Sequence, residues 1–196
     1  MILLRKLKTF LKLRDCSGYK VKGYPIVFLK NPRASGNSIQ FAIEKHLEGF
    51  EDYSFNPRHK KKYKFFMVCR NPYTKMESSY FHFLKVGEYN MLHKSMSFDW
   101  FVKAQCSIPE DKRDGHTKTQ SRFLKHNLKY NPHILRFENI EDDWKKFCLW
   151  KFNKELPFPH ANKSNRTNAE IKWTEELKDI VYETYTPDFF NFDYAR

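Results

Sequence analysis

The chain has 196 residues, enough for one domain with a sizeable core but too few for two comfortable ones. Aromatic residues make up 17% of it, and the glycine and proline contents are ordinary, so disordered and collagen-like classes are excluded. The formal net charge of +13 indicates an anionic partner, which could be a nucleotide, a nucleic acid, an anionic glycan or a membrane surface.

Residues 1–24 are expected to form a basic leading segment and linker, followed by one domain over residues 25–196. Apolar side chains from Ile2 to Leu11 could form a stripe opposite lysines and arginines, so that the segment either packs on the domain, which we favour, or touches a membrane. Charges interrupt its apolar run after three residues, which excludes a bilayer span and a signal peptide. We therefore expect a cytoplasmic protein.

The four cysteines are far apart in sequence and form no C-x-x-C pair. This spacing indicates neither a zinc site nor a disulfide framework, so we expect reduced thiols and no metal.

The first predicted element of the domain is a buried strand over Ile26–Leu29. A short, polar, cationic loop containing Arg33 follows it, and apolar residues then recur at helical spacing from Ile39 to Leu47. A strand, loop and helix in this order direct backbone N–H groups and the positive end of a helix dipole at one point. The loop is therefore a candidate phosphate site, although the same arrangement also occurs as a plain connection.

The same arrangement recurs. A second buried strand is predicted over residues 65–70, and Asn71 and Pro72 begin a second helix. Because ligands of open α/β sheets bind at the carboxyl ends of the strands, two such units in one domain predict a parallel sheet with both loops at one edge.

The remaining elements are simpler. The basic run from Arg58 to Lys64 is expected to be a solvated face, and residues 107–118, which contain Pro109 and Gly115, to be a surface loop. A short helix begins at Ser97, and a third strand over residues 133–137 precedes a helix that begins near Ile140. A last amphipathic helix spans residues 173–185.

Both loops resemble motifs of the sulfotransferases that use 3′-phosphoadenosine 5′-phosphosulfate (PAPS). Pro32 to Ser38 resembles their 5′-phosphosulfate loop, Pro-Lys-x-x-Gly-x-Ser, with Arg33 in place of the lysine. Val68 to Tyr80 resembles their 3′-phosphate loop, Val-x-Arg-x-Pro-x-x-Arg-x-x-Ser-x-Tyr, with Lys75 in place of the second arginine. Weaker similarities follow around His116 to Leu124, which resembles the carbohydrate branch, around Leu135 to Ile140, and in the closing segment.

The resemblance implies a single α/β domain of the P-loop-like three-layer sandwich type, with a central parallel sheet flanked by helices. It implies PAPS as the sulfate donor and 3′,5′-adenosine bisphosphate as the product. Arg33 would stabilise the departing 5′-phosphate, and Arg70 and Ser78 would hold the 3′-phosphate. The other candidate donor-binding residues lie in the first loop and in a segment that would close over the nucleotide: Ala34, Ser35, Gly36, Asn37, Ser38, Asn162, Lys163, Ser164 and Arg166.

A saccharide is the acceptor that the resemblance and the positive charge favour. Family members use either histidine or glutamate as the general base. His116 is our first choice because histidine titrates near neutral pH, and His59 and Glu51 are the other candidates. Two other readings stay open, namely a nucleotide-binding relative without catalysis and a nucleic-acid-binding module that uses the same basic surface.

Overall fold

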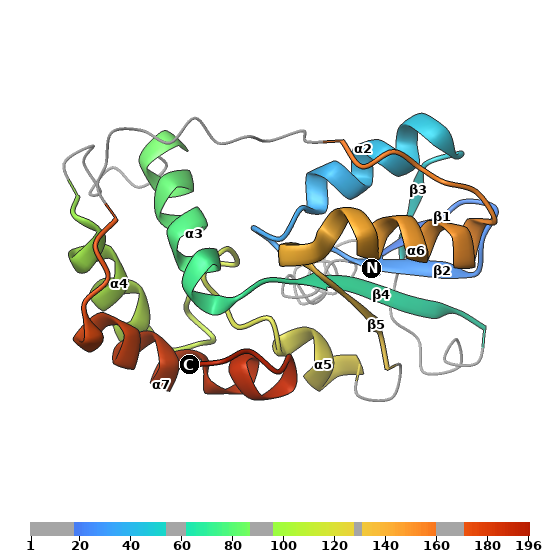
Figure 1. The fold of residues 1–196 in the computed structure, drawn as a ribbon. Helices are drawn as coiled ribbons and strands as arrows, with labels where there is room; N and C mark the ends of the chain where they lie inside the picture. The colour runs from blue at the N-terminus through green and yellow to red at the C-terminus, as the bar shows by residue number, and fades with distance from the viewer. Residues whose placement is uncertain (1–17, 54–61, 87–95, 128–130, 160–170) are drawn as a thin grey trace, which may run out of the picture.

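The computed structural model describes residues 18–53, 62–86, 96–127, 131–159 and 171–196 (Figure 1). Within them, one sheet has the strand order β3-β1-β2-β4-β5. Its strands are β1 (Gly18–Val21), β2 (Ile26–Leu29), β3 (Phe50–Tyr53), β4 (Lys64–Cys69) and β5 (His133–Arg136). β4 pairs in parallel with both β2 and β5, whereas β1 pairs antiparallel with β2 and β3. The chain is thus an α/β domain with a mixed sheet.

The expectation of a parallel sheet therefore holds for β2, β4 and β5 alone. The sequence analysis places the residues of β1 in the leading segment and linker and predicts no element for those of β3, yet both are strands. Each has only four residues, with half-exposed or exposed side chains among them, so neither presents the continuous apolar run that predicts a buried strand. β1 pairs with the adjacent strand β2, and β3 reaches β1 from a part of the chain that is distant in sequence.

The helices of the described residues are α2 (Gly36–His46), α3 (Pro72–Val86), α4 (Phe98–Ser107), α5 (Arg122–Asn127), α6 (Ile140–Phe152) and α7 (Glu175–Asn191), with a short 3₁₀ turn, η2 (Phe137–Asn139). Local caps explain two of the starts. The backbone N–H of Trp100 donates to the Ser97 hydroxyl before α4, and that of Tyr73 donates to Asn71 Oδ1 in α3. The predicted helices are confirmed, and α7 continues beyond the predicted end through Pro187, with a kink at Tyr185.

The sheet is covered on both faces. Helices α2 and α6 lie together against one face, and their apolar side chains share a core with alternate residues of the strands, such as Phe28, Phe66 and Trp144 (Figure 1). The opposite face packs Val27 and Met67 against Phe123 of α5, among others. This two-sided burial explains why β2 and β4 are apolar throughout.

Helices α3, α4 and α7 form a second core beside the sheet (Figure 1). The surface loop predicted over residues 107–118 is exposed or half-exposed over most of its first half, but its last two residues, Thr117 and Lys118, are buried, and the segment of residues 114–121 runs into this region. Thr117 and Gln120 are at most 1% exposed, and the hydroxyl of Tyr185 donates to the carbonyl oxygen of Thr117. Its polar groups are buried because α3 and α7 satisfy them with hydrogen bonds.

Within the described residues, none of the helices has both the length and the apolar composition of a membrane span. Cys69, Cys106 and Cys148 are free thiols, in agreement with the expectation for these three, and Cys16 lies outside the described residues. The apolar stripe expected between Ile2 and Leu11 also lies outside them.

Candidate functional site

The site begins where β2 and β4 end. Leu29 pairs with Met67 in the parallel register of these two strands. The chain leaves both strands at the same edge of the sheet, β2 toward α2 and β4 toward α3. The sequence-predicted loops therefore lie next to each other.

The first loop has an unusual backbone. Arg33 and Ser35 adopt left-handed conformations, with φ of 64° and 55°. Residues other than glycine rarely do so, and such strained positions cluster at ligand sites. The side chain of Ser35, the N-cap of α2, makes no capping hydrogen bond, and the first turn of α2 contains no acidic residue. Successive N–H groups in such a turn form a concave surface that suits an anion.

Other residues of this loop are buried beneath it. Ala34 is 1% and Ser38 6% exposed, whereas Asn37 is exposed. Gly36 packs against Lys30, whose Cγ would lie 2.9 Å from a Cβ at this position. Glycine therefore lets the loop approach the Lys30 side chain closely.

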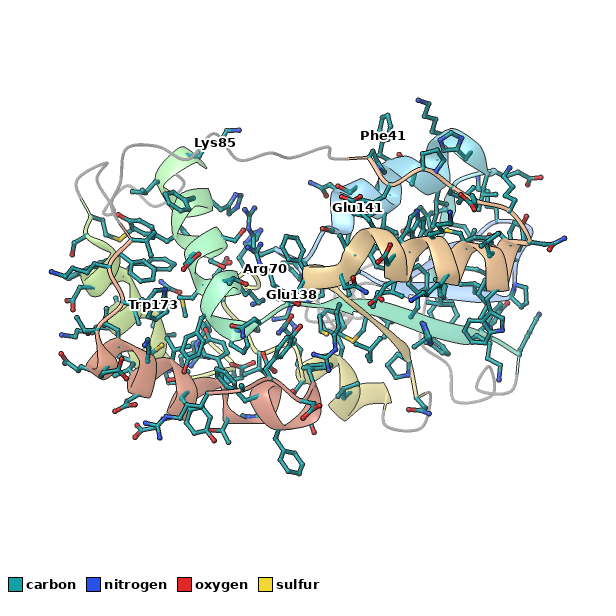
Figure 2. The ribbon with its side chains drawn as sticks, viewed as in Figure 1. Phe41, Arg70, Lys85, Glu138, Glu141 and Trp173 are labelled. Carbon is teal, nitrogen blue, oxygen red and sulfur yellow. The ribbon has the colours of Figure 1, made fainter. Side chains whose placement is uncertain are left out.

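Arg70 follows β4 and reaches the first loop. Its Nη1 donates to the carbonyl oxygen of Arg33 at 3.2 Å, and its Nε donates to Thr74 Oγ1 at 3.0 Å. The guanidinium lies 4.0 Å from the centre of the Phe137 ring. Figure 2 shows Arg70 and Glu138 close together, where the sheet meets α3. Burial, with Arg33 as a smaller cause, lowers the pKa of Arg70 to about 10.

Arg33 in turn contacts α3. Its Nε and Nη2 donate to the hydroxyl of Ser78 at 3.1 and 2.8 Å. Burial also lowers the pKa of Arg33. The structure thus brings Arg33, Arg70 and Ser78 together. Two partly desolvated guanidinium groups at one point repel each other, and an anion between them would relieve that cost.

Glu138 supports this site from η2. Its Oε1 accepts the backbone N–H of Asn71 at 2.7 Å, and its Oε2 accepts the hydroxyl of Tyr194 at 2.9 Å. Its charge also raises the pKa of Arg70. Glu138 therefore stabilises the turn after β4, which is a structural role.

Lys75 does not act as a second phosphate cation in this structure. It is 3% exposed, and its Nζ donates to the carbonyl oxygens of His116 and Lys118, both at 2.9 Å. Burial lowers its pKa to about 7. The lysine that replaces the family's second arginine holds the 114–121 segment on α3.

His116 is fixed on several sides. Asp114 Oδ1 lies 2.7 Å from both its Nδ1 and its backbone nitrogen, and its carbonyl oxygen accepts from Lys75 and from Ser79 Oγ. A carboxylate at Nδ1 favours the tautomer with the proton there, which leaves the lone pair on Nε2. This geometry suits His116 as a proton acceptor. The sequence analysis did not name Asp114, although its position two residues before His116 could have indicated it.

The sequence analysis missed His82. Its ring centre lies 4.4 Å from that of His116, with the planes tilted by 39°. Burial, followed by the nearby charges of His116 and Arg33, lowers its pKa to about 4. His82 follows Ser78 by one helical turn, so it shares a face of α3 with a motif residue, and that spacing could have indicated it.

A model of the sulfotransferase family matches residues 1–195. The chain belongs to the sulfotransferase family. Its general chemistry is therefore the transfer of a sulfuryl group to an acceptor. Searches of curated proteins and of solved structures returned no match.

Several candidates lie outside the described residues of this sulfotransferase. They are His59 and the expected closing segment with Asn162, Lys163, Ser164 and Arg166.

Glu51 is among the described residues, and its position argues against it as the general base. It lies in the edge strand β3, two strands away from β2, and forms an ion pair with Lys20 that lowers its pKa. The described part of the sulfotransferase contains no cluster of side chains that could hold a metal ion.

Proposed function

We propose that this sulfotransferase takes the sulfuryl group from PAPS and transfers it to a hydroxyl or amine of an acceptor, with a saccharide as the acceptor that we favour. The observation that carries the proposal is the meeting of the two loops. Arg70 donates to the backbone of Arg33, and Arg33 donates to Ser78. A ligand with phosphates at both ends is the anion that needs both loops at once.

The residues present fit such a donor. The N–H groups of residues 35–38 and the Ser38 hydroxyl would hold the 5′-phosphate, and Arg70 and Ser78 the 3′-phosphate. The donor, when bound, supplies an activated sulfuryl group that reacts by in-line displacement. Arg33 would stabilise negative charge on the departing phosphate. It would act as a fixed charge and not as a proton donor, because a guanidinium keeps its proton at ordinary pH.

We assign the acceptor side to His116 and His82. His116 Nε2 would take the proton of the acceptor group, and Asp114 would stabilise the imidazolium that forms. His82 touches the His116 ring and remains uncharged at neutral pH because its pKa is about 4. A neutral imidazole can donate a hydrogen bond to one hydroxyl group and accept one from another, which suits a saccharide acceptor.

The finer fold assignment belongs to the same proposal. We assign the domain to the P-loop-like three-layer type. The support is the strand, left-handed loop and helix from β2 to α2, together with burial of both sheet faces.

Thermal unfolding with added nucleotides tests the donor. We expect 3′,5′-adenosine bisphosphate at one hundred times its Kd to stabilise the protein by about 2.7 kcal/mol, and ATP and AMP at equal concentration to stabilise it less. Arg70→Ala should remove this difference. Lys103→Ala, which also deletes a positive charge but on the exposed surface of α4, should keep it.

Equal stabilisation by ATP would contradict the proposal and favour a general nucleotide or nucleic-acid binder. Incubation with sulfur-labelled PAPS and a panel of saccharides would then separate an enzyme from a protein that only binds the nucleotide. Labelled saccharide is the expected product.

A further inference from the structure

The side chain of Gln120 connects the two loops at the edge of the sheet. It is fully buried. Its Oε1 accepts from Asn31 Nδ2 at 2.7 Å and from the backbone N–H of Arg70 at 2.9 Å, and its Nε2 donates to the carbonyl oxygen of Arg70 at 2.7 Å. One amide therefore holds the start of the first loop and both backbone polar groups of Arg70.

Side-chain hydrogen bonds connect the two chain segments beyond the point where the backbone pairing of β2 with β4 ends. The recorded pairing of β2 with β4 ends at Leu29 and Met67. Beyond it, Asn31 Nδ2 donates to the carbonyl oxygen of Val68 at 2.9 Å, and Gln120 takes the place of a partner strand for Arg70. Among the described residues, Asn31 Oδ1 is buried with no hydrogen-bond partner, so the Asn31 amide is held through Nδ2 alone.

Other contacts between the loops, among the described residues, involve the site's own side chains. Arg70 Nη1 contacts the Arg33 backbone, and Arg33 contacts Ser78. A bound ligand would compete for these same groups. The hydrogen bonds of the Gln120 side-chain amide involve no charged side chain, so they can persist when the arginines bind an anion.

Gln120 is itself held in place. Its backbone N–H donates to Asp188 Oδ2 at 2.8 Å, and the next N–H, of Ser121, donates to Asp188 Oδ1 at 2.8 Å. Asp188 is fully buried in α7. The position of the glutamine is thus fixed from the helical core, independently of the two loops.

We propose that Gln120 is a positioning residue that sets the separation of the two phosphate loops, so that a nucleotide with both 5′- and 3′-phosphates gains affinity from binding both at once. This rests on the proposed function. A two-headed ligand gains from its second contact only when the two sites are held at the separation that it spans. Loose loops would still bind each phosphate singly, but would lose the advantage of the pair.

Ligand affinities in the full-length chain test this inference. Kd is measured for 3′,5′-adenosine bisphosphate, 5′-AMP and 3′-AMP. In Gln120→Met, we expect the bisphosphate to bind at least about tenfold more weakly, while both monophosphates stay within about twofold of the wild type. Damage that is merely structural would weaken all three alike.

Gln105→Met is the matched control. Gln105 is also a buried glutamine, and it accepts a hydrogen bond from Thr117 Oγ1 at 2.9 Å without touching either loop. We expect its three affinities to match the wild type. Gln120→Glu serves if the methionine variant does not fold, because it keeps the acceptor oxygen and loses the donor to the Arg70 carbonyl. It should lose part of the bisphosphate advantage.

A folded Gln120 variant with the wild-type ratio of affinities would overturn the inference, and so would equal weakening of all three nucleotides. A wild-type protein that does not prefer the bisphosphate would instead contradict the proposed function. The two failures are therefore distinguishable.

Discussion

At the scale of single residues, His82 shows how neighbouring charges control a side chain. Its ring lies against His116 and within the electrostatic reach of Arg33, and both lower its pKa in addition to the effect of burial. Two adjacent imidazoles resist holding two protons at once. The site therefore keeps His82 neutral over the range in which a free histidine titrates.

Acid should destabilise the protein through this residue. An unfolded histidine binds its proton near pH 6.5, whereas folded His82 does so near pH 4, so the unfolded state binds more protons between these values. The stability contributed by His82 is complete above pH 6.5 and is lost as the pH falls toward 4. We expect His82→Asn to lose less stability than the wild type between pH 7 and 4 in urea unfolding. Parallel curves for the two proteins would contradict the low pKa.

The cationic loop that contains Arg33 could be predicted from its place after an apolar strand, whereas the roles of Arg33, Arg70 and Ser78 were expected only from the resemblance to the sulfotransferase motifs. The sequence did not predict that Lys75 is buried. That burial comes from the 114–121 segment lying across α3, which is a contact between residues about 40 positions apart. The sequence shows that Lys75 carries a charge, but it does not show which distant segment buries that charge.

At the scale of elements, helix α7 supports the site through its kinked second half. Pro187 has no backbone N–H for the helix ladder, and Tyr185 departs from helical geometry with φ of −110° and ψ of 18°. Asp188 follows directly and accepts the N–H groups of Gln120 and Ser121. The half-helix beyond the kink thus reaches the segment that holds both loops.

Asp188→Asn should therefore cost more than an ordinary substitution in the same helix. An asparagine offers one acceptor oxygen to two buried N–H groups, and leaving one of them unsatisfied costs about 1–3 kcal/mol. We expect the free energy of unfolding in urea to fall by that amount. Asp179→Asn, also in α7 but exposed and paired with Arg196, should change it by less than about 1 kcal/mol. If both variants lost an equally small amount of unfolding free energy, the hydrogen bonds of Asp188 would not contribute measurably to stability.

Elements could be predicted where apolar residues follow one another or where a capping residue precedes a helix. β2, β4 and β5 were predicted from short apolar runs, and the helix starts at Ser97 and Asn71 from capping residues. β1 and β3 could not be predicted in this way, because Gly18–Val21 and Phe50–Tyr53 contain no two consecutive apolar residues. The end of α7 was missed because Pro187 normally ends a helix, whereas here the second core holds the chain helical beyond it.

At the scale of the whole molecule, the charge of +13 exceeds what one nucleotide site uses. Arg33 and Arg70 are only partly exposed, and burial lowers the pKa of each. Surface lysines, by contrast, are screened over a Debye length of about 8 Å at physiological ionic strength. The molecule therefore combines the proposed, partly buried anion site with an exposed basic surface, and the two should respond differently to salt.

Salt titration should separate these two kinds of binding. A polyanion carries condensed counterions and releases them when it covers a basic surface, so its affinity falls steeply with salt, whereas a single nucleotide has no such atmosphere. Between 50 and 500 mM NaCl we expect the affinity for chondroitin sulfate to fall at least about tenfold more than that for 3′,5′-adenosine bisphosphate. Fluorescence anisotropy with labelled forms of both ligands gives the two slopes, and a neutral oligosaccharide controls for contacts that are not ionic. Equal slopes would contradict the division, since they would mean that the nucleotide binds at the same exposed surface as the polyanion.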